Sequence, residues 1–252
     1  YFSCVMLQGG RTIFLLVPPI PESITYKTTF SLSAGNQCHS IDSDNSADMI
    51  VFGCGKYILT YDSNLPCMNR FSSSSGTNAQ SIGLHRKDNK VYYSDASWSI
   101  SYVGLDSLEK PIRVPLTARR SFASKEPAKI AVSDNYLALS NTDDHPLQLY
   151  RFSDQELHSH LLYGESLHSL KFHPDGDLIT LDFKGRVSKF EMIDNGEPKL
   201  IWKCCDVEGA YALCVDQESG LVYVTDREQS LHFIYGGKKS YGTVIVGFGG
   251  HN

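Results

Sequence analysis

A cluster of basic residues is the first group in this sequence whose types and spacing suggest a chemical role. Such a concentration of cations can neutralise the phosphates or carboxylates of a partner, and an aromatic residue upstream could stack on a flat group. The same pattern also fits a solvated loop that keeps a sheet edge soluble. The candidate partner-binding residues are Arg113, Arg119, Arg120, Lys125, Lys129 and Trp98.

Three aspartates recur at similar positions along the chain, each directly after a short run of strand-forming residues. Asp95, Asp182 and Asp226 are expected to end a strand, where the carboxylate can accept backbone N–H groups of the following turn. The alternative is a ring of metal-binding carboxylates. Because turn aspartates are common and these recur with a repeat, the structural interpretation is favoured.

Four histidines, His158, His160, His168 and His173, could in principle bind zinc or iron. No neighbouring Cys or Glu completes a known ligand spacing, so no metal site is predicted. The chain also contains no Gly-x-Ser-x-Gly, His-Glu-x-x-His or phosphate-binding glycine loop. We therefore predict a non-catalytic protein without a cofactor. A metal-dependent hydrolase or lyase, with ligands drawn from several repeats, stays open as an alternative.

Composition places the chain among folded globular proteins. It has 252 residues, of which 41% are hydrophobic and 20% charged, and this excludes disordered and fibrous classes. The net charge of −5 argues against a surface that is basic throughout. The longest aliphatic run near the start, Ile13–Val17, is far shorter than the roughly 20 residues of a spanning helix, so no membrane partner is predicted.

The seven cysteines are irregularly spaced, without a Cys-x-x-Cys pair, and the chain has no Asn-x-Ser/Thr acceptor. We interpret most thiols as small buried hydrophobic groups in a reducing compartment. An intracellular location, cytoplasmic or nuclear, is therefore predicted.

An internal repeat organises these residues. Three segments share a short strand, a polar turn near an Asp and a second alternating strand, which is typical of a β-hairpin: 91–103, 178–190 and 222–234. Weaker copies lie at 4–17, 49–61 and 137–152. The landmarks Gly10, Gly53, Asp95, Asn141, Asp182 and Asp226 recur every 41 to 46 residues, and a period of about 40–45 residues is typical of propeller blades.

Further strands surround each hairpin. Five leading strands are predicted at 37–41, 80–84, 129–132, 167–172 and 211–215. Six trailing strands are predicted at 24–30, 67–71, 112–116, 160–163, 200–204 and 244–248. The first unit lacks a clear leading strand, unless residues 1–3 or the tail near 247–252 supply it. No helical period is sustained anywhere.

The sequence therefore predicts one all-β domain over residues 1–252, a six-bladed β-propeller of four-stranded antiparallel blades. Seven blades remain open if the chain is part of a longer one. The predicted units span approximately 1–30, 31–77, 78–127, 128–165, 166–208 and 209–252.

The last two units carry a family resemblance. Residues 212–234 resemble an NHL repeat, with Val215-Asp216, then Gly220, then Tyr223-Val224-Thr225-Asp226. Residues 173–187, which begin His-Pro-Asp-Gly, fit a degenerate WD40 repeat equally well, although the Trp-Asp dipeptide of that family is absent throughout.

The predicted propeller is a rigid disc with faces built from loops, so we predict a scaffold that binds a protein within a larger complex or multidomain chain. As an alternative, the resemblance to NHL repeats implies single-stranded RNA held on a positively charged face, here the basic cluster with Trp98 as a stacking residue. We favour the protein partner because the chain as a whole is acidic.

Overall fold

The computed structural model describes residues 3–5, 12–16, 26–31, 38–43, 49–62, 68–72, 78–96, 99–106, 110–116, 129–140, 147–160, 166–193, 198–227 and 230–245. Within these residues the chain consists of strands, turns and irregular segments, without a helix. The described part accordingly contains no helix with the length and apolar character needed to cross a membrane.

In the described part of the chain, twenty-three strands form six antiparallel sheets. The first sheet has three strands, β1 (Ser3–Val5), β2 (Thr12–Leu16) and β3 (Tyr26–Ser31). The second contains β4 (Cys38–Ser43), β5 (Met49–Cys54), β6 (Tyr57–Asp62) and β7 (Met68–Ser72). The third contains β8 (Ala79–His85), β9 (Lys90–Asp95), β10 (Ile100–Gly104) and β11 (Ile112–Arg113).

The remaining three sheets repeat the same consecutive order of four strands. They contain β12 (Ile130–Val132), β13 (Tyr136–Ser140), β14 (Leu147–Arg151) and β15 (Glu156–His160), then β16 (Leu167–Phe172), β17 (Leu178–Asp182), β18 (Arg186–Glu191) and β19 (Lys199–Asp206). The last contains β20 (Ala210–Val215), β21 (Val222–Asp226), β22 (Ser230–Tyr235) and β23 (Lys238–Ile245).

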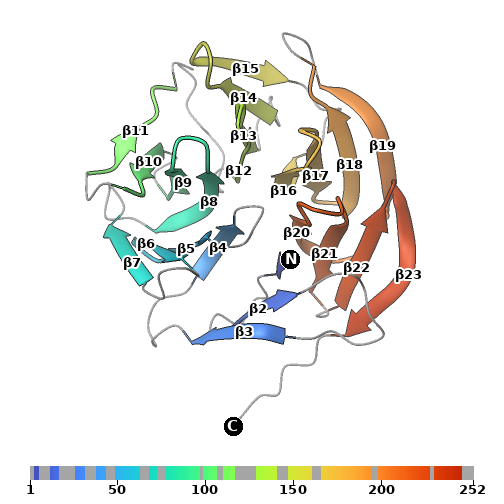
Figure 1. Ribbon diagram of the computed structural model, residues 1–252. Coiled ribbons are helices and arrows are strands. Elements are labelled where there is room, and N and C mark those ends of the chain that lie inside the picture. Colours follow the sequence, from blue (N-terminus) through green and yellow to red (C-terminus); the bar gives the residue numbers. More distant parts are fainter. Residues whose placement is uncertain are drawn as a thin grey trace.

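The sheets are arranged as blades around a central axis (Figure 1). The first strand of each four-stranded sheet lies nearest the axis and the fourth lies at the rim. Consecutive inner strands contact one another in the order β4, β8, β12, β16 and β20, and β1 contacts both β20 and β4. This arrangement confirms the predicted all-β propeller with antiparallel blades.

The prediction of six four-stranded blades needs a correction. Five sheets are four-stranded blades, whereas the first sheet has only three strands, so six four-stranded blades are not observed. The difference arises in the first sheet, which begins with the short strand Ser3–Val5. Among the described residues no further strand precedes β1, so this sheet lacks the fourth strand of the other blades.

The core lies between neighbouring sheets. In one cluster, residues of β12, β13 and β14 such as Leu147 pack against residues of β16, β17 and β18 such as Leu178, and both side chains have no exposed surface. A second cluster joins β17 and β18 to β20, β21 and β22 in the same way. Each blade therefore buries one face against the next.

The recurring aspartates cap the turns between the second and third strands, as the sequence predicts. In each case a side-chain oxygen accepts the backbone N–H four residues later, from Ser99 to Asp95 (3.1 Å), from Arg186 to Asp182 (3.0 Å) and from Ser230 to Asp226 (2.8 Å). Asp95 has no exposed surface. These bonds fix the hairpin turns that the repeat signature marked.

Two trailing strands lie earlier in the chain than predicted. The strand predicted at 160–163 is β15, which begins at Glu156 because Asp154 accepts the N–H of Glu156 (3.0 Å) and tightens the preceding turn. The strand predicted at 244–248 is β23, which begins at Lys238. Gly236 and Gly237 both have positive φ, which permits a two-residue hairpin turn that brings Tyr235 opposite Lys238.

One cysteine departs from the predicted pattern of free thiols. Cys54, at the end of β5 and almost fully buried, is disulfide-bonded, whereas Cys204 and Cys214 are not part of a disulfide. Structural disulfides are rare in reducing compartments. The intracellular location therefore stays a prediction, and the disulfide of Cys54 does not support it.

Candidate binding face and central channel

The inner strands line a central channel that contains a cavity of about 160 Å³. Residues of β4, β8, β16 and β20, together with Lys129 and Ile130 at the start of β12, form its wall. Because an inner strand has no neighbouring strand on its axial side, its backbone groups there need other partners.

Side chains of the preceding blade satisfy several of these backbone groups. The hydroxyl oxygen of Ser40 on β4 accepts the N–H of Ile82 on β8 (3.0 Å), and that of Ser81 on β8 accepts the N–H of Ile130 on β12 (3.0 Å). Oδ2 of Asp42 accepts the N–H of Leu84 (2.8 Å). Polar side chains of the inner strands therefore join β4 to β8 and β8 to β12.

An ion pair also links two blades that are not neighbours in the sequence. Nζ of Lys171 on β16 lies 2.5 Å from Oδ1 of Asp42 on β4, and both side chains are about four-fifths buried. The second oxygen of Asp42 is already bound to β8, so this one carboxylate connects three inner strands.

A β-bulge recurs near the start of four inner strands. The register shifts between Cys38 and Ser40, Ala79 and Ser81, Leu167 and Ser169, and Ala210 and Ala212. Bulges re-aim the extra side chain and are common next to functional sites. The extra residues are His39, whose side chain lies outside the described set, and Gln80, His168 and Tyr211, which all line the cavity.

Rings gather at the same end of the channel. The ring of His168 lies 5.6 Å from that of Tyr211 on the next blade and 4.9 Å from that of Phe183 in the β17–β18 turn, both edge to face. Phe183 is 52% exposed. We call the group Gln80, Lys129, His168 and Tyr211 the bulge ring.

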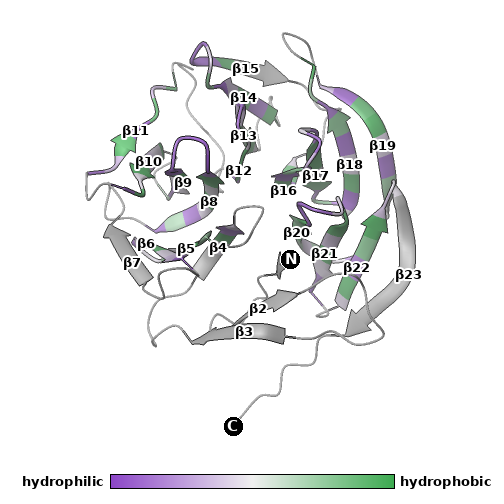
Figure 2. Cartoon of the chain, viewed as in Figure 1, coloured by the Kyte–Doolittle hydropathy of each residue, from purple (hydrophilic) through white to green (hydrophobic). Residues whose placement is uncertain are grey.

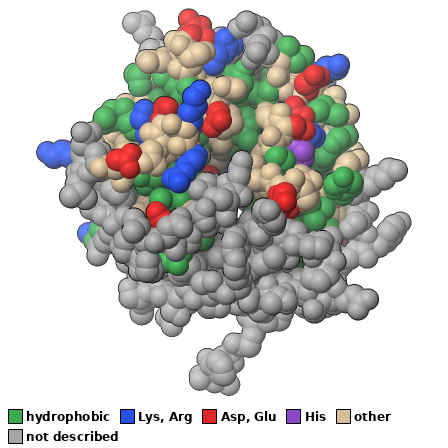
Figure 3. All heavy atoms as spheres, viewed as in Figure 1, with side chains coloured by type: hydrophobic (Ala, Val, Ile, Leu, Met, Phe, Trp, Pro, Cys, Tyr) green, Lys and Arg blue, Asp and Glu red, His purple; other side chains and the backbone are tan. Residues whose placement is uncertain are grey.

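The opposite end of the channel opens into a wider depression of about 910 Å³. It is lined by the turns that join the first and second strands of four blades, at 86–89, 133–135, 173–177 and 216–221. We call this side the first-turn face. Its turns are hydrophilic (Figure 2), and charged side chains of both signs are interspersed around its centre (Figure 3).

Two histidines connect neighbouring turns on this face. Nε2 of His85, at the end of β8, lies 3.2 Å from the carbonyl oxygen of Asp134 in the next blade. Nε2 of His173, after β16, lies 3.2 Å from the carbonyl oxygen of Gly220 in the blade that follows. Since a carbonyl oxygen only accepts, Nε2 is the donor in both bridges.

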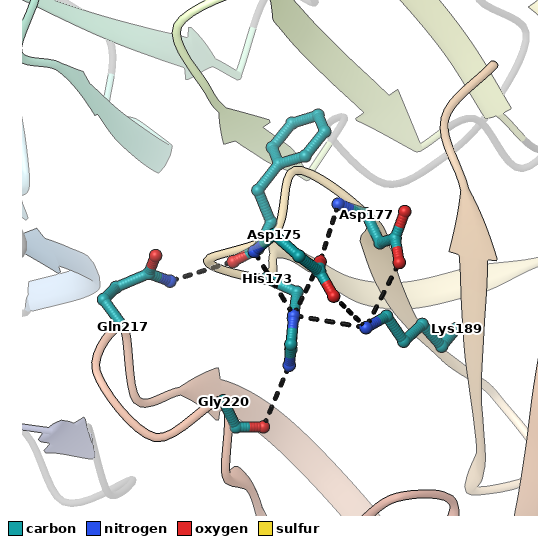
Figure 4. A network of polar contacts seen from close by, with 7 residues as sticks. His173, Asp175, Asp177, Lys189, Gln217 and Gly220 are labelled. Atoms are coloured by element: carbon teal, nitrogen blue, oxygen red, sulfur yellow. Dashed lines mark hydrogen bonds and ion pairs between the residues drawn. The ribbon is translucent and has the colours of Figure 1, made fainter.

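The second bridge belongs to a larger network (Figure 4). The ammonium group of Lys189 on β18 contacts Asp175 and lies 3.2 Å from both Nδ1 of His173 and Oδ2 of Asp177. From the next blade, Gln217 donates to the carbonyl oxygen of Phe172 (2.9 Å). The network holds the β16–β17 turn in a fixed position beside the depression.

The network changes the acidity of Asp175. Burial raises the pKa of its carboxyl group, but hydrogen bonds from Lys189, from the N–H of Asp177 and from His173 lower it by more. The pKa of Asp175 is therefore below its ordinary value. The charged carboxylate is therefore the form that the folded protein favours.

This shift predicts a loss of stability at acid pH. A group whose pKa is lowered by folding contributes stability above its unfolded value, near 3.8, and loses it as the pH falls through the folded value. We expect urea unfolding between about pH 6 and about pH 3 to show a smaller decrease in unfolding free energy for Asp175→Asn than for the wild type. Identical decreases would contradict the role given to Asp175.

The basic cluster is only partly within the described residues. Arg113 is exposed on the rim strand β11, whereas Lys129 is partly buried and lines the cavity. These two residues therefore do not share one patch. Arg119, Arg120, Lys125 and Trp98 lie outside the described residues, and their role in RNA or protein binding stays a prediction. In the described part, no group of three or more His, Cys, Asp or Glu is placed to hold a metal ion.

The bulge ring and the histidine bridges were not predicted from the sequence. The partners in the bridges are separated by 47 and 49 residues, about one repeat, so only an alignment of the blades in space brings them together. In the sequence, His173 is only one of four histidines that could in principle bind a metal. Lys189 and Gln217 carried no signal of their own in the sequence.

Comparison with known proteins supports the fold alone. No family model matches the chain and no curated protein matches it, so neither an NHL nor a WD40 identity is confirmed. A solved chain described as "Crystal structure of Nidogen/Laminin Complex" matches with a TM-score of 0.70 and 11% identity, over 92% of this chain and 87% of that chain. This chain is similar to it in its β-propeller architecture.

Proposed function

We propose that this chain is a non-catalytic interaction module that binds a protein partner across the first-turn face. The depression on this face carries the proposal, because it is assembled from the turns of four blades. Rigid scaffolds with loop-built faces commonly bind partners in this way. The solved chain with a similar fold comes from a complex of two proteins, which agrees with a protein partner.

The charges on this face support recognition rather than catalysis. Lys189 is paired with Asp175 and Asp177, and Lys171 with Asp42, so these groups are held in place by one another. The exposed side chains of Lys87 and Asp134 lie on neighbouring turns that line the depression of the first-turn face. Such a polar rim, with both signs of charge, can set the orientation of a partner.

We further propose that the three-stranded sheet occupies the sixth place in the ring. The contacts of β1 with β20 on one side and β4 on the other support this position. A ring in which every sheet has a neighbour on both sides protects the sheet faces that a partner would otherwise have to cover.

A charge-exchange variant tests the binding face. Lys87→Glu combined with Asp134→Lys reverses two charges on the first-turn face and leaves the net charge unchanged. The matched control is Lys184→Glu with Glu208→Lys, two exposed residues in turns on the opposite side. We expect affinity capture from nuclease-treated lysate, read by quantitative mass spectrometry, to lose its main protein partner with the first variant and to keep it with the second.

Two outcomes would contradict this proposal. Capture that is equal for both variants would show that the first-turn face is not the binding surface. A partner that disappears after nuclease treatment would favour the RNA alternative.

A further inference from the structure

We propose that the outer edge of the rim strand β19 is a second docking surface, which takes an extended, acidic segment of a protein partner as an added β-strand. β19 (Lys199–Asp206) is the last strand of its sheet and pairs only with β18 among the described strands. It lies at the outside of the ring, away from the central channel (Figure 1). None of its residues lines the depression of the first-turn face, so its test does not depend on the protein that binds there.

The backbone of β19 provides a long edge. β19 has eight residues, whereas the rim strand β11 has two. Edge strands are normally kept short, because their outer N–H and C=O groups can pair with another chain. Along Lys199–Lys203 no described strand covers the outer side. An extended segment that adds to a sheet edge pairs with such groups.

Exposed apolar side chains gather along this edge. Leu200 and Ile201 are 40% and 49% exposed, and Ile193 and Tyr235 are exposed as well. These are four of the six large hydrophobic residues that are exposed in the described part of the chain. Figure 2 shows the hydrophobic stretch in β19. Grouped apolar side chains at a surface mark interaction sites, whereas single ones are common everywhere.

The two apolar residues outside β19 lie beside it. The end of β18, which Ile193 follows, pairs with Lys199 at the start of β19. A Cβ atom on Gly237 would lie 2.9 Å from Cγ of Trp202. The β22–β23 turn, which Tyr235 precedes, therefore packs on the middle of β19.

A β-bulge accounts for the two consecutive apolar side chains. Leu200 and Trp202 pair with consecutive residues of β18, so Ile201 between them is the extra residue of the bulge. Trp202 packs on the core cluster toward the β20–β23 blade, whereas Leu200 pairs with Phe190 of the cluster toward the β12–β15 blade. Edge bulges often discourage pairing. Here the added residue is apolar and exposed, which favours contact with a partner.

Lysines at both ends of the apolar pair determine the charge of the partner. Lys203 is exposed. Lys199 is 70% exposed and lies 3.9 Å from the equally solvated carboxylate of Glu191. Such an exposed pair contributes little, so the Lys199 ammonium can turn toward another carboxylate. A partner strand with an acidic residue at each end complements this edge.

The same lysines disfavour a second copy of this chain as the partner. Antiparallel pairing of two β19 strands about Ile201 would place Lys199 of one copy opposite Lys203 of the other. Like charges directly opposite each other destabilise a pair of strands. The edge therefore fits a different, acidic strand.

The probe is the capped peptide acetyl-Glu-Val-Thr-Val-Glu-amide, which matches Lys199–Lys203 in length and carries a carboxylate at each end. We expect saturable shifts of amide NMR signals in β19 and cross-strand contacts to the same residues. The control peptide acetyl-Lys-Val-Thr-Val-Lys-amide should bind about tenfold more weakly, because it sets like charges opposite the lysines.

N-methylation tests whether the peptide binds as a strand. Alternate N–H groups of a strand point to the same neighbour, so a methyl group on the central threonine nitrogen and methyl groups on the two valine nitrogens block different hydrogen bonds. We expect one derivative to bind like the parent peptide and the other about tenfold more weakly.

Variants of exposed residues test the edge itself. Ile201→Ser should weaken binding of the glutamate peptide about fivefold, whereas Ile112→Ser, at an exposed isoleucine of the rim strand β11, should leave it unchanged. Lys199→Glu combined with Lys203→Glu should reverse the preference, so that the lysine peptide binds more tightly. Thermal melting checks that each variant is folded.

Several results would overturn the proposal. These are no saturation with the glutamate peptide, equal affinities of the two peptides, and equal losses from both N-methylated derivatives. Sedimentation of the free chain tests the second copy. A dimer that Ile201→Ser dissociates would assign this edge to self-association instead.

Discussion

Replacing Lys189 with methionine is expected to lower the melting temperature by about 6–12 °C. The ammonium group is almost buried and contacts Asp175 and Asp177, so its loss leaves two carboxylates beside each other without a cation. Breaking a buried pair costs about 3–5 kcal/mol, and because Asp175 is 47% exposed we expect about 3 kcal/mol. For a chain of this size each kcal/mol corresponds to about 2–4 °C.

Lys184→Met is the control for this experiment, since Lys184 is exposed in a turn of the same blade. It removes the same charge and is expected to change stability by less than about 0.5 kcal/mol. Calorimetry on both variants gives the comparison. Equal melting temperatures would mean that the network around His173 contributes nothing to the stability of the first-turn face.

Replacing Asp182 with alanine should destabilise the protein by about 3 kcal/mol. Its carboxylate accepts the backbone N–H groups of Lys184 (2.9 Å) and Arg186 (3.0 Å) and the side-chain Nε of Arg186 (2.7 Å). The variant leaves all three donors without an acceptor, and each unsatisfied buried donor costs about 1–3 kcal/mol where it is fully desolvated. Urea unfolding measures the difference.

Asp182→Asn separates the two contributions of this side chain. Its remaining oxygen can still accept both backbone N–H groups, while the charge that holds Arg186 is lost. We expect a destabilisation about half that of the alanine variant. If asparagine proves as harmful as alanine, the ion pair with Arg186, and not the turn hydrogen bonds, stabilises this hairpin.

The sequence predicted the blades well because each hairpin is a local structure. Alternating strands around Asp95, Asp182 and Asp226 gave the second and third strands of those blades to within a few residues. The errors at β15 and β23 came from turns at Asp154 and at Gly236-Gly237 that were not recognised. Local sequence patterns therefore predict the strand positions of this fold wherever the residues that form the turns are recognised.

The candidate sites could not be predicted in the same way. A β-bulge depends on how two strands pair, and neither Gln80 nor Tyr211 differs in its local sequence from an ordinary strand residue. The bridges of His85 and His173 join residues almost one full repeat apart. The basic cluster was predicted as a site because its residues are close together in the sequence. In the structure, Arg113 lies at the outer edge of its blade, whereas Lys129 lies at the central channel.

The ion pair between Lys171 and Asp42 has a consequence for how the ring unfolds. In most repeat architectures each unit touches only its neighbours, so stability is a sum of adjacent contacts and the chain can open from one end. Here residues separated by 129 positions are joined across the axis, and the same carboxylate holds β8. Opening the β4–β7 blade would take the carboxylate of Asp42 away from the ammonium of Lys171 on β16, so part of the cost falls on a distant blade. The two blades are thereby coupled in one cooperative unit, although they are far apart in the sequence.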